Sequence, residues 1–232
     1  MTTAIITGAS RGLGLAFARA LAGKRWNLVI TARGAANLES AKIELEQHTQ
    51  VRAIAGDVAD HTHLQKLVDA AKEFGSLDAL VNNASILGSS PQSKLEVYPL
   101  ETLEQVYRVN VFAPLRLLQL ALPIMNPDAR VLNITSDAGV EAYEGWGGYG
   151  SSKAALEQLS KVLALEHPNL RVYSLDPGDM NTQMHQEAFP GEDISDRPAP
   201  EDSLPGLLTL LERNLPSGRY QARGDLNAST HE

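Results

Sequence analysis

Short apolar runs alternate with stretches of helical periodicity along most of this chain. The apolar runs are near-continuous rather than alternating with polar residues, which is typical of strands buried on both faces of a parallel sheet. They predict strands at about residues 4–7, 27–31, 51–55, 77–81, 130–135, 172–175 and 219–222. Between them, apolar residues spaced i, i+3 and i+4 predict helices at about residues 12–23, 36–48, 64–74, 103–122, 149–166 and 201–214.

This alternation of strand and helix predicts an α/β fold, a Rossmann-like doubly wound parallel sheet with helices on both faces. No linker or internal repeat interrupts it, so we expect residues 1–232 to form a single domain, with a C-terminal tail at about 225–232. Two segments break the rhythm, at 87–98 and at 179–200, and we expect the second to hold at most a short helix. Because ligands bind beyond the carboxyl ends of the strands in such sheets, both segments are expected to cover a site.

Composition and charge narrow the classes of function. The chain has 232 residues, 43% apolar and 21% charged, which is ordinary for a soluble globular protein. A formal net charge of −8 argues against nucleic acid as a partner, and the absence of cysteine excludes a thiol nucleophile or a thiolate metal site. The N-terminus does not resemble a signal peptide and no apolar run approaches the length of a membrane span, so we expect a cytoplasmic protein without a membrane partner.

A glycine-rich turn follows the first predicted strand and opens a helix. It reads Thr7-Gly8-Ala9-Ser10-Arg11-Gly12-Leu13-Gly14. Glycines let the backbone approach a pyrophosphate closely, and a helix N-terminus supplies N–H donors and partial positive charge. The turn therefore indicates a dinucleotide site, although a merely tight strand–helix connection would have the same pattern.

A tyrosine and a lysine are paired at the start of a long predicted helix. Tyr149 and Lys153 are four residues apart, so their side chains share one helical face. A nearby ammonium favours the phenolate, and we expect it to lower the pKa of Tyr149 and make the phenol a general acid–base. Taken alone, the pair is a weak signal, because a Tyr four residues before a Lys is usually part of an exposed helix surface.

Further motifs accompany these two along the chain: Asp57-Val58, Asn82-Asn83-Ala84, Asn110, Ser136 and Pro177-Gly178. Together, and in this order along the sequence, they resemble the short-chain dehydrogenase/reductase family from residue 3 to about 224. The resemblance implies that Tyr149 is the acid–base and Ser136 a second donor to the substrate oxygen. It implies that Lys153 holds the nicotinamide ribose and that Asn110 anchors a water in a proton relay. Alone, Ser136 would suit a strand-ending turn and Asn110 a helix interior. The chain departs from the family at Ser85, where glycine is usual.

The resemblance also implies a set of cofactor contacts, and the residues at the end of the second strand indicate which dinucleotide binds. Arg33 lies where NAD-binding folds place an acid, and Arg11 adds a second cation, so we predict a preference for NADP(H), with NAD(H) possible. Both arginines would also suit a solvated surface. The predicted cofactor-binding residues are Gly8, Ser10, Arg11, Gly12, Leu13, Gly14, Arg33, Asp57, Val58, Asn83, Ala84, Tyr149, Lys153, Pro177, Gly178 and Thr182.

An apolar substrate pocket is predicted above the nicotinamide, lined by Trp146, Met180, Met184 and Phe189. The alternative is that Met184 and Phe189 only anchor the segment 179–200 to the core by apolar packing. No metal site is predicted, since His61 and His63 match no ligand spacing that we recognise and suit a solvated helix start.

A homodimer or homotetramer is predicted through the helices at 103–122 and 151–166. Apolar residues cover more of the first helix than one sheet-facing stripe requires. These residues are Val106, Val109, Val111, Leu115, Leu117, Leu118 and Leu120.

Two functions follow from the sequence. The first is an NADP-dependent oxidoreductase that interconverts a carbonyl and an alcohol on a small-molecule substrate. The second is a non-catalytic, dinucleotide-sensing or regulatory module on the same fold, because fold does not fix function. The complete set of Asn110, Ser136, Tyr149 and Lys153 favours the enzyme.

Overall fold

A seven-stranded sheet forms the centre of the molecule, with strand order β3-β2-β1-β4-β5-β6-β7. The computed structural model describes residues 2–224 and 226. Each neighbouring pair of strands is parallel, which confirms the predicted doubly wound fold. The strands are β1 (Thr3–Thr7), β2 (Asn27–Ala32), β3 (Val51–Ala55), β4 (Leu77–Asn82), β5 (Met125–Ile134), β6 (Arg171–Asp176) and β7 (Gly218–Gln221).

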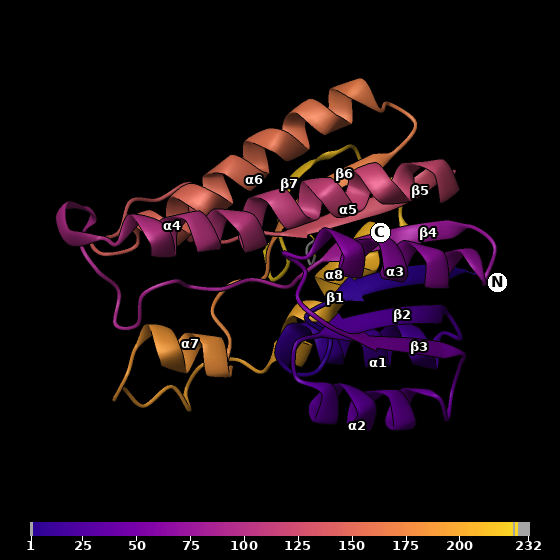
Figure 1. Ribbon diagram of the computed structural model, residues 1–232, viewed down its shortest axis with the longest axis horizontal. Coiled ribbons are helices and arrows are strands. Elements are labelled where there is room, and N and C mark those ends of the chain that lie inside the picture. Colours follow the sequence, from indigo (N-terminus) through magenta and orange to yellow (C-terminus); the bar gives the residue numbers. More distant parts are fainter. Residues whose placement is uncertain (1, 225, 227–232) are drawn as a thin grey trace.

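Helices cover both faces of this sheet (Figure 1). On one face lie α1 (Gly12–Gly23), α2 (Ala35–Leu45) and α8 (Leu204–Glu212), and on the other α3 (His61–Lys72), α5 (Ala113–Ala121) and α6 (Gly147–Glu166). Successive side chains of β1 alternate between the faces, so Ile6 packs on the α1 side and Ile5 on the α3 side. Each such buried side chain contributes roughly 1.5–3 kcal/mol of transfer free energy.

The helix predicted at 103–122 is interrupted. It begins earlier, as α4 (Leu100–Tyr107), passes through a π-helical turn (Arg108–Phe112) and continues as α5. Pro114 has no N–H to donate to the Asn110 carbonyl, so the regular α pattern cannot run through this point. Asn110 lies inside the π turn, a distortion that is frequent at functional sites.

The segments expected to cover a site do lie together. Residues 179–200 contain one short helix, α7 (Gln183–Ala188), whose first turn is capped by Thr182. The 87–98 segment holds a single 3₁₀ turn (Leu95–Val97), and the Ser90 hydroxyl donates to the Glu187 carbonyl of α7 at 2.6 Å. Of the predicted tail at 225–232, only Leu226 is among the described residues, and its side chain is buried in the core.

The apolar residues cited for a subunit interface are mostly internal. Val106, Val109, Val111, Leu117 and Leu118 are buried within the chain, because this helix packs between the sheet and its neighbours α3 and α6. The apolar surface that does face outwards on the two helices belongs to Phe112, Val162 and Leu165. Within the described part of the chain, no helix has the length and apolar character needed to cross a membrane.

Candidate active site

A cavity of about 640 Å³ opens at the carboxyl edge of the sheet, where the strand order reverses between β1 and β4. Its wall is built from the ends of β1, β2, β4, β5 and β6 and from α7. Most of the predicted site residues line it. The exceptions are Gly14, Asn110 and Phe189, which lie behind the wall. Such a position is the usual ligand crevice of a doubly wound sheet.

The glycine-rich turn is shaped for close approach of the backbone. Gly8 has φ +69°, and a Cβ on Gly14 would lie 2.4 Å from the Gly8 carbonyl oxygen. Asn83 fixes the turn by donating to the carbonyls of Thr7 and Gly8 at 2.8 and 3.2 Å. Helix α1 then begins without a side-chain cap, so its N-terminal N–H groups face the cavity as donors for an anion.

Ser136 and Tyr149 meet at the inner end of the cavity. Ser136 follows β5 by two residues and Tyr149 lies in the first turn of α6; the Ser85 and Ser136 hydroxyls both act to lower the pKa of the phenol. The Ser136 hydroxyl also donates to Asp137 Oδ1 at 2.8 Å. A substrate oxygen would have to compete with that carboxylate for the hydroxyl.

The pKa of Tyr149 is raised, which is opposite to the expected direction. Burial of the phenol is the main cause, and the carboxylates of Asp176 and Asp137 add to it. The Lys153 ammonium lies 5.3 Å from the centre of the Tyr149 ring, but the expectation of a lowered pKa underestimated the loss of hydration around a phenol that is only 7% exposed.

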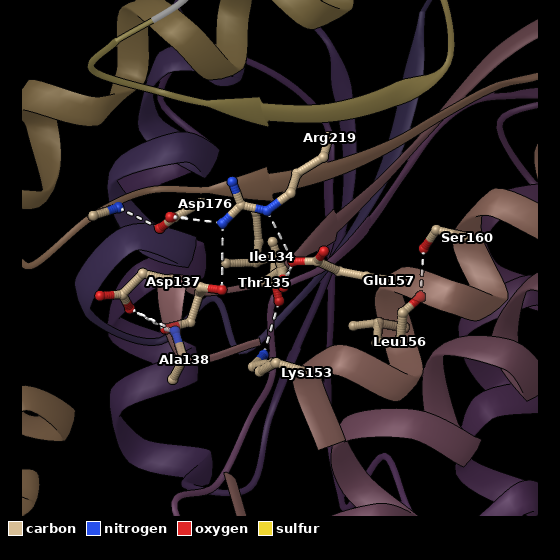
Figure 2. Close-up of polar contacts among 12 residues, drawn as sticks. Ile134, Thr135, Asp137, Ala138, Lys153, Leu156, Glu157, Ser160, Asp176 and Arg219 are labelled. Atoms are coloured by element: carbon tan, nitrogen blue, oxygen red, sulfur yellow. Dashed lines mark hydrogen bonds and ion pairs between the residues drawn. The ribbon is translucent and has the colours of Figure 1, made fainter. Parts of the chain in front are cut away.

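Lys153 is almost completely buried, and burial lowers its pKa to about 8 while the charge of Glu157 opposes that effect. Its Nζ donates to the main-chain oxygen of Ile134 at 2.8 Å (Figure 2). Asn110 is held against α6: it exchanges hydrogen bonds with the main chain of Ile86 and donates to Ser152 Oγ at 3.0 Å. The structure thus places Asn110 close to the turn of α6 that carries Lys153.

Aromatic and apolar side chains gather above Tyr149. The Trp146 ring packs edge-on against Tyr149 with centroids 5.8 Å apart, and Phe189 packs on Trp146 at 5.7 Å. Met184 joins the same cluster, whereas Met180 lines the cavity but packs against the main core. Three of the four predicted pocket residues therefore converge around the phenol.

The opposite end of the cavity is exposed. Arg33 lines it without a hydrogen bond or ion pair to any residue that the structure describes. Arg11 donates through Nη1 to Gln183 Oε1, which connects the glycine-rich turn to α7. Asp57 and Val58 line the same region, after β3.

The two histidines near α3 turn towards different neighbours. His63 is buried with its Nε2 2.8 Å from Thr31 Oγ1, and burial lowers its pKa. The exposed His61 lies against Arg116, with Nδ1 3.1 Å from Nε. The suggestion of a solvated helix start therefore fits His61, but His63 belongs to the core.

Sequence reasoning missed several polar groups of the site. Ser85 was noted only as a departure from glycine, yet its buried hydroxyl acts to lower the pKa of the phenol and has no hydrogen-bond partner by geometry among the described residues. Asp137 could have been suspected because it follows Ser136. His185, packed on Phe189 at 4.9 Å, and Arg219, which reaches the site from β7, carry no local signal in the sequence.

Known proteins resemble this chain over most of its length. A family model described as short chain dehydrogenase matches residues 2–193. Benzil reductase ((S)-benzoin forming) of Saccharomyces cerevisiae is 33% identical over 194 residues, covering 79% of this chain and 73% of that protein. Sepiapterin reductase of Rattus norvegicus is 33% identical over 199 residues, covering 79% and 76%.

A similar solved structure agrees with these relatives. It is a short chain dehydrogenase from Shigella flexneri 2a complexed with NADP, 26% identical, with a TM-score of 0.88 over 96% of this chain and 97% of that one. The family resemblance of the motifs, the strand order and the matched length thus agree: this chain belongs to the short-chain dehydrogenase/reductase family of oxidoreductases.

Proposed function

We propose that this protein reduces a carbonyl compound to an alcohol with NADP(H), using Tyr149 as the proton donor. One observation carries the proposal: a buried phenol, a serine hydroxyl and a buried ammonium converge at the inner end of a cavity whose outer end holds a glycine-rich turn. A module that only senses a dinucleotide would have no need of the inner set.

The residues fit a dinucleotide. The uncapped start of α1 offers main-chain donors to a pyrophosphate, and Arg33 is free to meet a 2′-phosphate. The NADP complex of the Shigella flexneri relative supports this cofactor. When bound, NADPH supplies the hydride.

The chain supplies hydrogen bonds and a proton. Ser136 and Tyr149 donate to the carbonyl oxygen, where negative charge develops and donors lower the barrier most. The raised pKa keeps Tyr149 in its acid form at neutral pH, which suits reduction. As the proton passes from the phenol to the substrate oxygen, the neighbouring Lys153 ammonium stabilises the phenolate that remains.

The experiment is to follow NADPH oxidation against a panel of aldehydes, ketones and quinones. We include benzil, because a relative is named for it and because the cluster around Trp146 and Phe189 suits an aromatic group. Turnover of a panel member supports the proposal. Tight NADPH binding without turnover of any of them would favour the dinucleotide-sensing alternative.

We also propose a homo-oligomer through α5 and α6. Phe112, the last residue of the π turn before α5, is 57% exposed and Leu165 of α6 is 83% exposed, an apolar exposure that a second copy would cover. Sedimentation at micromolar concentration tests this: an assembly of two or four chains is expected, and a monomer would contradict it.

A further inference from the structure

A cluster of charged side chains lies beside Lys153, and one of its members, Asp176, also lines the cavity (Figure 2). Its centre is Arg219 of β7, whose Nε lies 3.1 Å from Glu157 Oε1 and whose Nη2 lies 3.1 Å from Asp176 Oδ2. The side chains of Glu157 and Asp176 are only 4% and 6% exposed. Buried carboxylates of this kind are costly unless they are paired, so the arrangement calls for an explanation.

The cluster touches each catalytic element. Arg219 Nη2 also donates to the main-chain oxygen of Ser136 at 3.5 Å, and Asp176 Oδ1 accepts from Gly178 N at 2.9 Å. Glu157 accepts from Thr135 Oγ1 at 2.6 Å, directly before Ser136, and lies one helical turn after Lys153. One guanidinium therefore connects the strand end that bears Ser136, the helix that bears Lys153 and the segment of Pro177 and Gly178.

The charges in this region balance. The titratable and charged groups around Lys153 are Tyr149 and Glu157 on α6, Asp137 after β5, Asp176 on β6 and Arg219 on β7. Four charged side chains are buried here or bridge the buried ones: Lys153 and Arg219 are positive, and Glu157 and Asp176 are negative. Lys153 forms no ion pair with any described residue, so its buried ammonium depends on charge that acts through space.

We propose that Glu157 and Arg219 are a positioning pair for the reaction: Arg219 fixes the main chain at Ser136, and Glu157 supplies the negative charge that a buried Lys153 ammonium needs. The inference rests on the proposed function for its link to catalysis. The directions of the pKa shifts agree with it, since Glu157 opposes the effect of burial on Lys153.

Opposite shifts from two substitutions test the pair. The Lys153 midpoint is followed by NMR of ¹³Cε-labelled lysine in the whole protein, and its signal is assigned from its loss in Lys153→Met. Glu157→Gln removes a negative charge and is expected to lower the midpoint from about 8 by about one unit or more. Arg219→Gln removes the positive charge that offsets Glu157 and is expected to raise it.

Glu166→Gln is the matched control, because it is the same substitution at an exposed position of the same helix and should leave the midpoint unchanged. A purely structural role would lower the melting temperature without moving the midpoint, and an unmoved midpoint in folded Glu157→Gln would overturn the proposal. Should that variant not fold, Arg219→Gln decides: a midpoint that stays or falls would equally overturn it.

The catalytic consequence is measured separately. The basic limb of the plot of kcat/KM against pH should shift to lower pH in Glu157→Gln and to higher pH in Arg219→Gln. Arg219→Lys keeps the positive charge, so its basic limb should lie at the wild-type pH. Because the lysine titration needs no substrate, it tests the positioning pair even if no substrate is turned over. Failure of the proposed reaction and failure of the pair are therefore distinguishable.

Discussion

The two ends of the cavity are built in opposite ways. At the inner end Tyr149 and Lys153 are 7% and 2% exposed, and the Lys153 ammonium already donates a hydrogen bond to the Ile134 main chain without a ligand. At the outer end Arg33 and Arg11 are exposed, and within the described chain only Arg11 has a partner. Ordering such a long side chain costs up to about 2 kcal/mol of rotamer entropy, a cost that the preorganised inner groups do not incur on binding.

This difference separates chemistry from recognition. Groups that are fixed in advance contribute their full electrostatic effect to the transition state. Groups that a ligand must order contribute only what remains after that cost. We therefore expect substitutions at the inner end to change kcat strongly and substitutions at the outer end to change the choice of cofactor moderately.

The largest effect is expected for Tyr149→Phe. Deleting the hydroxyl removes the proton donor, so kcat should fall by about 10²–10⁴-fold while NADPH binding, measured by fluorescence, stays nearly unchanged. Tyr107→Phe is the matched control, since Tyr107 lies outside the cavity lining and its hydroxyl has no hydrogen bond to any described residue. Retention of more than about a tenth of the wild-type kcat would show that Tyr149 is not the acid.

At the outer end, the wild type should prefer NADPH over NADH by about tenfold to a few hundredfold in kcat/KM. A charge-assisted bond from Arg33 to the 2′-phosphate contributes about 1.5–3 kcal/mol before discounting for exposure. Arg33→Asp should erase or invert the preference, because it repels the phosphate and accepts from a free hydroxyl.

Arg25→Asp makes the same change at the other end of β2, away from the cavity, and should leave the preference intact. Equal kcat/KM for both cofactors in the wild type would contradict the role of Arg33 but not that of Tyr149.

The two ends also differ in how well the sequence predicted them. Near-continuous apolar strands and the motifs around Gly8 and Tyr149 are local patterns, so the sheet and the residues around the phenol were predictable. The π turn at Asn110 was not, because helical periodicity does not register one missing N–H at Pro114. Arg219 was not predictable either, since its partners are 43 and 62 residues away and are brought to it by the β6–β7 pairing and by the packing of α6 against β7.

The raised pKa of Tyr149 was missed for a related reason. Spacing along a helix shows that Lys153 is a neighbour, but burial depends on every element that packs around the phenol. Trp146, which lies against that ring, is one such element.

Trp146→Ala tests the apolar cover of the inner end. An aromatic substrate should lose ring contacts of about 0.5–1.5 kcal/mol, so its KM should rise roughly two- to tenfold while kcat changes less. An aliphatic ketone of similar size is the control and should be less affected. Equal changes in KM for the two substrates would show that Trp146 only shapes the loop.

The smallest effect concerns Ser85, the position where family members usually have glycine. Its hydroxyl is buried beside Tyr149 and acts to lower the pKa of the phenol, against the larger effect of burial.

Ser85→Ala removes this hydroxyl, so the pKa of Tyr149 should rise further. Alcohol oxidation requires the phenolate, and its acidic limb should therefore move to higher pH, whereas carbonyl reduction uses the acid form and should keep its pH dependence. One lost hydrogen bond of about 0.5–1.5 kcal/mol predicts a two- to tenfold lower rate of oxidation at neutral pH. If the hydroxyl is responsible, Ser85→Gly must show the same shift as Ser85→Ala. A shift in Ser85→Gly alone would show that the loop backbone causes the effect, and Ser136 would then be the one serine donor at the inner end among the described residues.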